Sequence, residues 1–231
     1  VVVGSLLAFT AEYLKPVISK NKRLEKEQNI LYAMGVNEND ENSAVFVSTE
    51  LVDDVFAKYI TKQLVIQNGV TTEDDQAYLI DIKKEQAAAK NDPSKRRLPL
   101  FVGESHGKTF YIAPVLGKGL WDAVWGYIAM DENMVVQGAY FDHKAETPGL
   151  GANIKERFFM DDFIGEHLLD EAGNFKSIDI SKSNADPTNI DKKDNEVDAI
   201  AGATITGNGI AAMLKSDLKL YVPYFKTLKN N

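Results

Sequence analysis

The chain has 231 residues, of which 44% are hydrophobic and 26% charged, so it is expected to form a soluble globular protein with a sizeable core. Its net charge of −8 argues against binding to nucleic acid, because phosphate contacts require a basic surface. The absence of cysteine excludes iron–sulfur clusters, thiol catalysis and structural zinc, and three widely spaced histidines predict no metal site.

The first segment, residues 1–14, is mostly apolar but too short to cross a bilayer, which takes ~20 apolar residues. We expect it to be the remnant of an N-terminal membrane anchor, with a signal-peptide remnant or a terminal core helix as alternatives. Residues 16–34 have mixed charges and no strand alternation, with Pro16 suited to a first helical turn and Gly35 to a helix end. The sequence therefore predicts a membrane-proximal helix over 15–35 and a main domain over 36–231.

The middle of the chain predicts a helix followed by strands. Apolar residues of 48–64 fall on one helical face, with Ser48 or Thr49 as a possible cap. Short apolar runs follow at 64–66, 78–82 and 98–102, and 83–97 is a polar connector. Strands are expected at 108–116, 123–130 and 134–142, the last two forming a hairpin around 131–133.

The C-terminal part predicts a mixture of loops and helices. Its expected elements are a glycine-rich loop over 143–154, a helix over 155–168, a strand over 175–180, a polar loop over 181–195 and a helix from about 204 to 221. Trp125, Phe158 and Phe159 are expected in the core. Short-linked strands with helices before and after predict an α+β fold, with an antiparallel sheet flanked by helices.

The stretch "DAIAGATITGNG" (198–209) precedes the last predicted helix. Gly202 and Gly207 have the spacing of a P-loop, but Asn208 and Gly209 replace its lysine and hydroxyl residue, and no Rossmann glycine pattern is present. A small, hydroxyl-bearing turn at a helix start favours a phosphate, because free N–H groups and the helix dipole meet there. The structural alternative is that Thr204 or Thr206 only caps the helix.

These residues resemble the flavinylation motif of the FMN-binding domain family, Asp-x-x-Ser/Thr/Ala-Gly-Ala-Thr. The resemblance implies that a flavin transferase attaches FMN through its phosphate to Thr204; the usual Ser or Thr is Ala201 here. The stretches at 14–31, 117–131 and 143–151 are similar, in order, to the family of C subunits of sodium-translocating NADH:quinone reductases. The G-type subunits of Rnf electron-transfer complexes match less well and are the alternative.

The resemblance also implies which residues surround the cofactor. Leu120, Trp121 and Leu150 are expected to cover the flavin ring, and Lys118 to approach the phosphate. Thr147 is a hydrogen-bond candidate, whereas His143 and Glu146 are interpreted as ordering their loop rather than acting in catalysis. Trp121 as a core residue and Lys118 as a solvated charge are the alternatives. The complete predicted site is Lys118, Gly119, Leu120, Trp121, Glu146, Thr147, Gly149, Leu150, Gly151, Gly202, Ala203, Thr204, Ile205 and Thr206.

The function implied is that of an electron carrier with covalent FMN, a subunit of a sodium-pumping NADH:quinone oxidoreductase. Its expected partners are the other subunits of that membrane complex, and its expected location is the bacterial inner membrane, with the flavin domain on the periplasmic side. A non-redox binding or scaffold module of the same fold is the alternative from another functional class.

Overall fold

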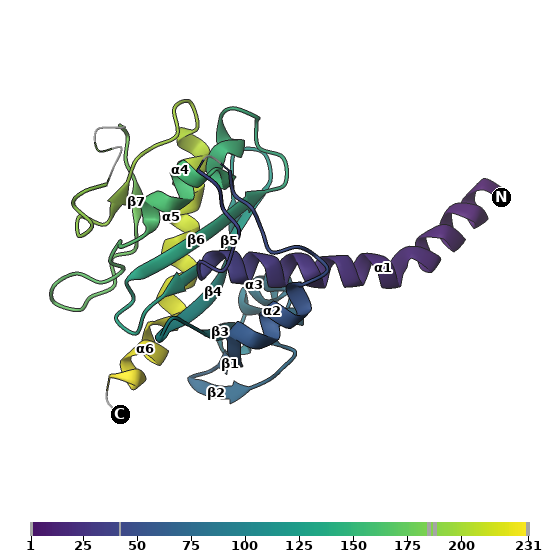
Figure 1. The fold of residues 1–231 in the computed structure, drawn as a ribbon, viewed down its shortest axis with the longest axis horizontal. Helices are drawn as coiled ribbons and strands as arrows, with labels where there is room; N and C mark the ends of the chain where they lie inside the picture. Colours follow the sequence, from purple (N-terminus) through teal and green to yellow (C-terminus); the bar gives the residue numbers. More distant parts are fainter. Residues whose placement is uncertain (1, 42, 184–185, 187–188, 230–231) are drawn as a thin grey trace.

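The structure is a computed structural model that describes residues 2–41, 43–183, 186 and 189–229. Its centre is a six-stranded antiparallel sheet in the order β2-β1-β3-β4-β5-β6 (Figure 1). The strands are β1 (Ile60–Gln67), β2 (Val70–Glu73), β3 (Leu98–Ser105), β4 (Lys108–Lys118), β5 (Ala123–Met130) and β6 (Val136–His143). The predicted α+β class and the three predicted central strands are confirmed.

Two of the hairpins are closed by residue pairs with left-handed backbone. Asn68 and Gly69 join β1 to β2 with φ of 49° and 78°, and His106 and Gly107 join β3 to β4 with φ of 49° and 73°. Two-residue turns of this kind match the twist of the flanking strands. The hairpin predicted around 131–133 is also present, since β5 and β6 pair antiparallel on either side of it.

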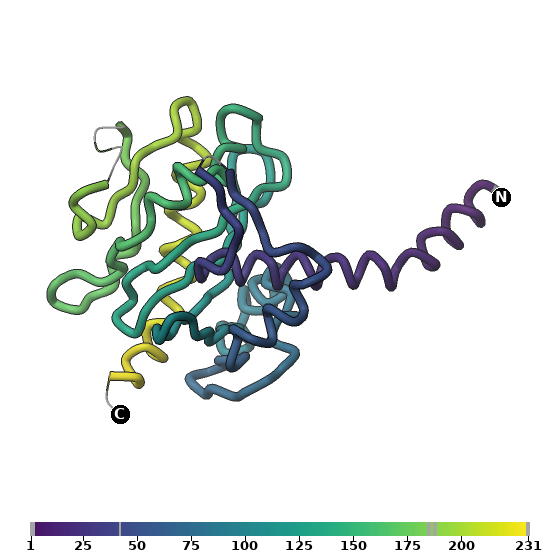
Figure 2. The backbone as a smooth tube through the Cα atoms, viewed as in Figure 1, coloured from purple at the N-terminus to yellow at the C-terminus, as the bar shows by residue number. Residues whose placement is uncertain are grey.

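Helices cover both faces of the sheet. Gly138 of β6 lies against the carbonyl group of Ala33 in α1 (Val2–Ala33), and Gly117 of β4 lies against Met213 in α5 (Thr204–Leu218). The strand register aligns Gly138, through Ala129, with Ile112. Ile112 and Gly117 are an odd number of positions apart on β4, so Gly138 faces the side of the sheet opposite Gly117. Figures 1 and 2 show α1 and α5 crossing the sheet with the strands between them.

The N-terminal helix α1 is continuous through Pro16, so the predicted helix start at that residue is wrong. Figure 1 shows the outer part of α1 bending away from the rest, and proline explains a bend because it removes one backbone hydrogen bond and crowds the preceding turn. Across the described residues, no helix has both the length and the apolar content required of a membrane span. The second half of α1 packs into the same core as the sheet through Ile30 and Leu31.

The helix predicted over 48–64 is shorter than expected. The observed α2 spans Val52–Tyr59, its N-cap is Leu51 without a side-chain cap, and Ile60 already begins β1. Pairing of β1 with β2 and β3 outweighs the helical spacing of this segment. The connector at 83–97 contains α3 (Ile82–Ala89) and a 3₁₀ turn, η2 (Pro93–Lys95), after η1 (Ala77–Leu79).

Two further predictions are corrected in the segment after β6. The helix predicted over 155–168 is reduced to α4 (Arg157–Met160) and η4 (Asp161–Phe163), because Gly165 has φ of 91° and its N–H bonds to Val136. The strand predicted over 175–180 is reduced to β7 (Asp179–Ile180), which pairs in parallel with β8 (Glu196–Val197). The polar loop lies partly outside the described residues. The remaining elements are η3 (Gly151–Lys155), η5 (Lys219–Tyr221) and α6 (Val222–Leu228).

The three aromatic residues expected in the core behave differently. Phe159 is buried and packs against Phe141 and Phe163, as predicted. Phe158 is 63% exposed, because the single turn of α4 turns only one of the two neighbouring rings toward the sheet. Trp125 is only half-buried and borders a cavity on the α1 face. Core placement is therefore wrong for Phe158 and only partial for Trp125.

Candidate functional site

The turn that precedes α5 leaves the first N–H groups of that helix without a side-chain cap. Gly202 has φ of 72°, a conformation that favours glycine, and Ala203 occupies the N-cap position. The interpretation of Thr204 or Thr206 as an N-cap is therefore wrong. The uncapped N–H groups and the positive end of the helix dipole favour an anion at this position.

The two threonines of the first turn of α5 have different surroundings. Thr204 is exposed, and its hydroxyl group makes no hydrogen bond within the described part of the chain. Thr206 is 1% exposed and donates its hydroxyl hydrogen to Glu146 Oε2 over 2.5 Å. Thr204 is thus the accessible hydroxyl of the motif, whereas Thr206 is committed to an internal contact.

Glu146 connects three segments that are far apart in the sequence. The residue is 4% exposed, and its carboxylate accepts the Thr206 hydroxyl and, through Oε1, the backbone N–H of Trp121 over 2.9 Å. Burial opposes its ionisation, but the hydrogen bonds from Thr206 and from backbone N–H groups at 120–122 outweigh burial and hold the pKa of Glu146 below its usual value. Glu146 is therefore an internal anion that fixes the start of α5 to the turn after β4.

The loop that carries Glu146 is organised by its own hydrogen bonds. The N–H of Glu146 donates to His143 Nδ1 over 3.2 Å, and the N–H groups of Leu150 and Ala152 both donate to the Thr147 carbonyl over 3.1 Å. These contacts agree with a loop-ordering role for His143 and Glu146.

Two buried glycines leave the space that the Glu146 carboxylate occupies. A Cβ atom on Gly119 would lie 2.6 Å from Glu146 Oε1, and one on Gly151 would lie 2.5 Å from Thr206 Oγ1 and 2.6 Å from Glu146 Oε2. Contacts this short do not occur for real Cβ atoms. The glycines at these positions are therefore required by packing around Glu146, whether or not a ligand is bound.

Other glycines bring α5 close to β4. A Cβ atom on Gly209 would collide with the carbonyl oxygen of Lys118, and one on Gly117 would lie 2.7 Å from Met213 Cβ. The backbone of α5 can approach the end of β4 because both side chains are missing. This close packing places the first turn of α5 beside the turn at 119–122.

A pocket of about 240 Å³ lies at the junction of these three segments. Its lining consists entirely of predicted site residues: Leu120, Glu146, Thr147, Leu150, Gly151, Gly202, Ala203, Thr204, Ile205 and Thr206. The structure thus brings the turn after β4, the loop after β6 and the start of α5 together. Lys118, Gly119, Trp121 and Gly149, also predicted for the site, are not part of this lining.

Apolar side chains surround the pocket at the surface. Leu120, Leu150 and Ile205 line the pocket and are exposed. Trp121 is 64% exposed, so its interpretation as a core residue is wrong, and its indole N–H donates to Thr147 Oγ1 over 3.1 Å. Lys118 is exposed at the end of β4, as its interpretation as a solvated charge predicts. An exposed apolar rim above a buried polar floor suits a ligand with a flat apolar ring.

The dimensions and chemistry of the pocket fit FMN only as a partly exposed group. Sites that enclose a small molecule are usually ~300–1,000 Å³, so a pocket of about 240 Å³ holds part of such a ligand and leaves the rest at the surface. Exposed Thr204 at the uncapped helix start suits the phosphate end, and the apolar rim suits the ring system.

Comparison with known proteins identifies relatives of the whole chain. The model of the FMN-binding domain family matches residues 119–219. The chain is 30% identical to the C subunit of the Na⁺-translocating NADH-quinone reductase of Pseudomonas aeruginosa, over 90% of this chain and 83% of that protein. It is 29% identical to the protein of the same name in Haemophilus ducreyi, over 89% and 80% of the two chains.

Solved structures of C subunits from the same family are similar to this chain in fold. The crystal structure of the C subunit of the Na⁺-translocating NADH-quinone reductase from Parabacteroides distasonis superimposes with a TM-score of 0.76 and 31% identity, covering 92% of this chain and 96% of that one. NqrC of Shewanella oneidensis superimposes with a TM-score of 0.70 and 25% identity, covering 91% and 99%. The similarity extends well beyond the FMN-binding domain.

Proposed function

Because the chain belongs to the family of C subunits of Na⁺-translocating NADH-quinone reductases, we propose that it carries FMN as a phosphoester on Thr204 and transfers electrons between neighbouring subunits of such a complex. The observation that carries this proposal is the contrast between the two threonines. Thr204 is exposed beside the pocket at an uncapped helix start, whereas the hydroxyl of Thr206 is bonded to Glu146.

The proposal gives each segment around the pocket a definite task. FMN would supply the electron-transfer chemistry when bound, and the protein would supply its position and electrostatic surroundings. The start of α5 would hold the phosphate end, and Leu120 and Leu150 would contact the ring from the turn after β4 and the loop after β6. Trp121 is held by its bond to Thr147 at the edge of the pocket. Lys118 and Gly149 do not line the pocket.

A partly exposed cofactor suits an electron carrier. A pocket of about 240 Å³ is too small to enclose the whole cofactor, so part of the ring would lie at the surface, where a partner protein could approach it. The partners proposed are the other subunits of a membrane NADH:quinone reductase, with a flavin transferase needed for maturation. The chain alone would act as a carrier rather than as a complete enzyme.

We also propose an inner-membrane location, with the flavin domain on the periplasmic side. Support comes from the outer half of α1, which extends away from the domain (Figure 1) and carries the exposed residues Val3, Leu6, Leu7 and Phe9. Exposed apolar side chains in such a row favour burial in lipid or against a partner protein. Fusion of alkaline phosphatase to the C-terminus should give an active reporter, and activity of a cytoplasmic reporter there would contradict this orientation.

The attachment site can be tested by producing the protein together with a flavin transferase. Wild-type chain should remain fluorescent after denaturation and gel separation, and intact mass should show one added FMN unit. Thr204→Ala should lose both signals while its unfolding transition stays close to that of the wild type, because no hydrogen bond of the Thr204 hydroxyl is lost. Thr204→Ser, which keeps a hydroxyl group, is the matched control and should retain attachment.

Peptide mapping distinguishes the proposed site from its neighbour. The added mass should fall on Thr204, and its presence on Thr206 would refute the assignment. A wild-type chain that never acquires flavin under these conditions would instead favour a non-redox module of the same fold.

A further inference from the structure

A second cavity, of about 400 Å³, lies on the α1 face of the sheet. Its walls come from α1, from the segment spanning η1 and the start of α3, and from β3, β4 and β5. The register pairs Trp125 with Leu116 and Tyr127 with Pro114, so these side chains point away from Gly117 and α5. The sheet therefore separates this cavity from the pocket at Thr204, and none of its residues was predicted to bind a ligand.

Lysine side chains dominate the charge of this second cavity. Lys22 and Lys26 come from α1 and Lys83 from α3, whereas Asp81 is the single acidic residue of the lining. Asp81 is also occupied in capping α3, because it accepts the N–H of Lys84 over 3.1 Å. Within the described part of the chain, Lys22 and Lys83 form neither an ion pair nor a side-chain hydrogen bond. The lining thus has a surplus of positive charge.

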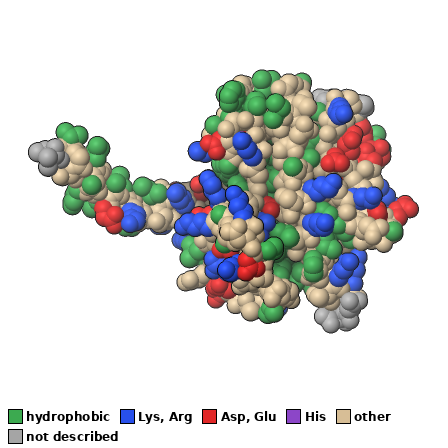
Figure 3. All heavy atoms as spheres, turned by 180° about the vertical axis from the view of Figure 1, so that it is seen from behind, with side chains coloured by type: hydrophobic (Ala, Val, Ile, Leu, Met, Phe, Trp, Pro, Cys, Tyr) green, Lys and Arg blue, Asp and Glu red, His purple; other side chains and the backbone are tan. Residues whose placement is uncertain are grey.

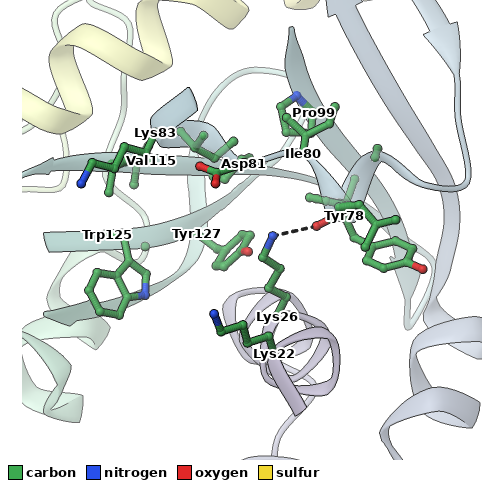
Figure 4. A pocket seen from close by; sticks show the side chains of 17 residues that line it. Lys22, Lys26, Tyr78, Ile80, Asp81, Lys83, Pro99, Val115, Trp125 and Tyr127 are labelled. Carbon is green, nitrogen blue, oxygen red and sulfur yellow. Dashed lines mark hydrogen bonds between the residues drawn. The ribbon is translucent and has the colours of Figure 1, made fainter. Parts of the chain in front are cut away.

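Lys26 is the most enclosed of these cations. Its ammonium group donates to the carbonyl of Tyr78 over 3.0 Å, the contact drawn in Figure 4, and it has two further hydrogens to donate. Burial lowers the pKa of Lys26, and the nearby charge of Asp81 only partly opposes this. A half-buried ammonium group without a carboxylate partner is costly, and an anion bound beside it would offset that cost.

The rest of the lining is apolar and aromatic. Figure 4 shows Lys22 and Lys26 extending from α1 toward the strand that carries Trp125 and Tyr127. Pro99 and Phe101 on β3 and Pro114 on β4 continue the apolar wall. A cavity of about 400 Å³ falls within the range of small-molecule sites, which combine mostly apolar walls with a few polar groups.

We propose that this cavity binds an anionic amphiphile, a ligand with one phosphate or carboxylate group and an apolar body, with Lys22 and Lys26 contacting the anion, Lys83 adding positive charge to the lining and the β3–β5 wall contacting the body. A free anion without an apolar body would leave that wall in water, and a neutral ligand would leave the lysines unpaired. Figure 3 shows Lys and Arg side chains gathered where α1 joins the domain, which would attract an anion. The inference does not depend on the flavin proposal.

Trp125 provides a direct reporter, because Trp121 is the only other tryptophan of the chain. In a Trp121→Phe background, the full chain is titrated with decyl phosphate below its critical micelle concentration, while Trp125 emission is recorded at constant flavin content. A saturable change is expected. Decyl maltoside, with the same chain and a neutral head, and inorganic phosphate alone should each bind at least ~10-fold more weakly, because each lacks half of the interactions.

Charge variants test the role of the lysines. Lys26→Gln removes a charge-assisted hydrogen bond to the anion and should therefore weaken decyl phosphate binding about 10-fold or more. Lys22→Gln is a second variant that tests the role of the lysines. Because Lys22 is exposed, its replacement is expected to have little effect on folding. Lys84→Gln is the matched control, since Lys84 is an exposed neighbour on α3 outside the lining and should change the affinity less than ~2-fold.

Vesicles identify the source of the ligand. A Trp125 response to phosphatidylglycerol vesicles but not to phosphatidylcholine vesicles would identify an anionic lipid, whereas a response to monomeric decyl phosphate alone would identify a free metabolite of the same chemistry. The proposal is overturned if decyl phosphate gives no saturable response, if decyl maltoside binds equally well, or if Lys84→Gln weakens binding as much as Lys26→Gln.

Discussion

Replacing Glu146 by glutamine tests whether one buried carboxylate holds the candidate flavin site together. The side chain is 4% exposed and accepts the Thr206 hydroxyl over 2.5 Å and the Trp121 N–H over 2.9 Å. Glutamine has nearly the same shape, but it has one acceptor oxygen and a donor NH₂ group in place of two acceptor oxygens. One of the two contacts must therefore be reversed, and both lose the contribution of the negative charge.

The expected loss of stability follows from these two bonds. A hydrogen bond to a charged group contributes about 1.5–3 kcal/mol and a neutral one about 0.5–1.5 kcal/mol, a difference of about 1 kcal/mol per bond. With two bonds affected, we expect the free energy of unfolding of Glu146→Gln at pH 7 to be lower by about 2 kcal/mol. The proposed attachment of FMN to Thr204 should also be slower, because the first turn of α5 is less well fixed.

The pH dependence gives the decisive comparison. The pKa of Glu146 is lowered in the folded protein, so its contribution is complete above the unfolded value of about 4.3 and is lost as the pH falls through the folded pKa. Glutamine has no such dependence. The stability gap between wild type and Glu146→Gln should therefore narrow between pH 5 and the acid limit of folding.

Urea unfolding followed by circular dichroism at pH 7, 5 and 4, extended downward while the chain stays folded, measures this gap. Glu104→Gln, at an exposed position on β3, is the matched control and should leave the unfolding free energy within ~0.5 kcal/mol at pH 7. Equal stability of Glu146→Gln and wild type at pH 7, or a gap that stays constant on acidification, would refute the role assigned to this carboxylate.

Two further predictions concern packing and buried charge. Gly209→Ala should lower the free energy of unfolding by about 1–3 kcal/mol and weaken flavin attachment, because the new Cβ collides with the Lys118 carbonyl. Asn208→Ala, on the exposed side of α5, should have neither effect. Urea unfolding of both variants measures the difference in stability. Burial raises the pKa of Glu166 to about 7, so its folded form keeps a proton that the unfolded chain has lost, and stability should fall as the pH rises from about 4.3 through 7. Glu166→Gln should remove that slope and be more stable than wild type at pH 8 in the same assay.

The sequence predicted the centre of the fold better than its edges. Strands β4, β5 and β6 alternate between short turns and form neighbouring hairpins, so their local pattern and their tertiary pairing agree. The segment at 48–64 has helical spacing throughout, yet from Ile60 it pairs with β2 and β3. The Asn68-Gly69 dipeptide was the available signal for this hairpin, since that pair is typical of two-residue turns with left-handed backbone.

The residues of the candidate site were predicted, but the hydrogen bonds between them were not. Resemblance to the FMN-binding family indicated the three segments, and all ten residues that line the pocket were among those predicted. The bond between Glu146 and Thr206 spans 60 positions and has no local pattern, so only the folded structure could reveal it. The second cavity was missed for the same reason, since Lys22, Lys83 and Trp125 come from separate elements.

The arrangement at the start of α5 gives a reason why the proposed covalent bond to FMN would be useful there. The pocket lining contains Glu146, which stays ionised, and no lysine or arginine. A phosphate held only by contacts would gain ~0.3–1 kcal/mol from the helix dipole, while the negative charge of Glu146 in the same lining would repel it. Contacts alone would therefore hold the phosphate weakly. A phosphoester on exposed Thr204 would keep the anion in place without a basic residue, and Glu146 could remain the internal anion that positions the turn.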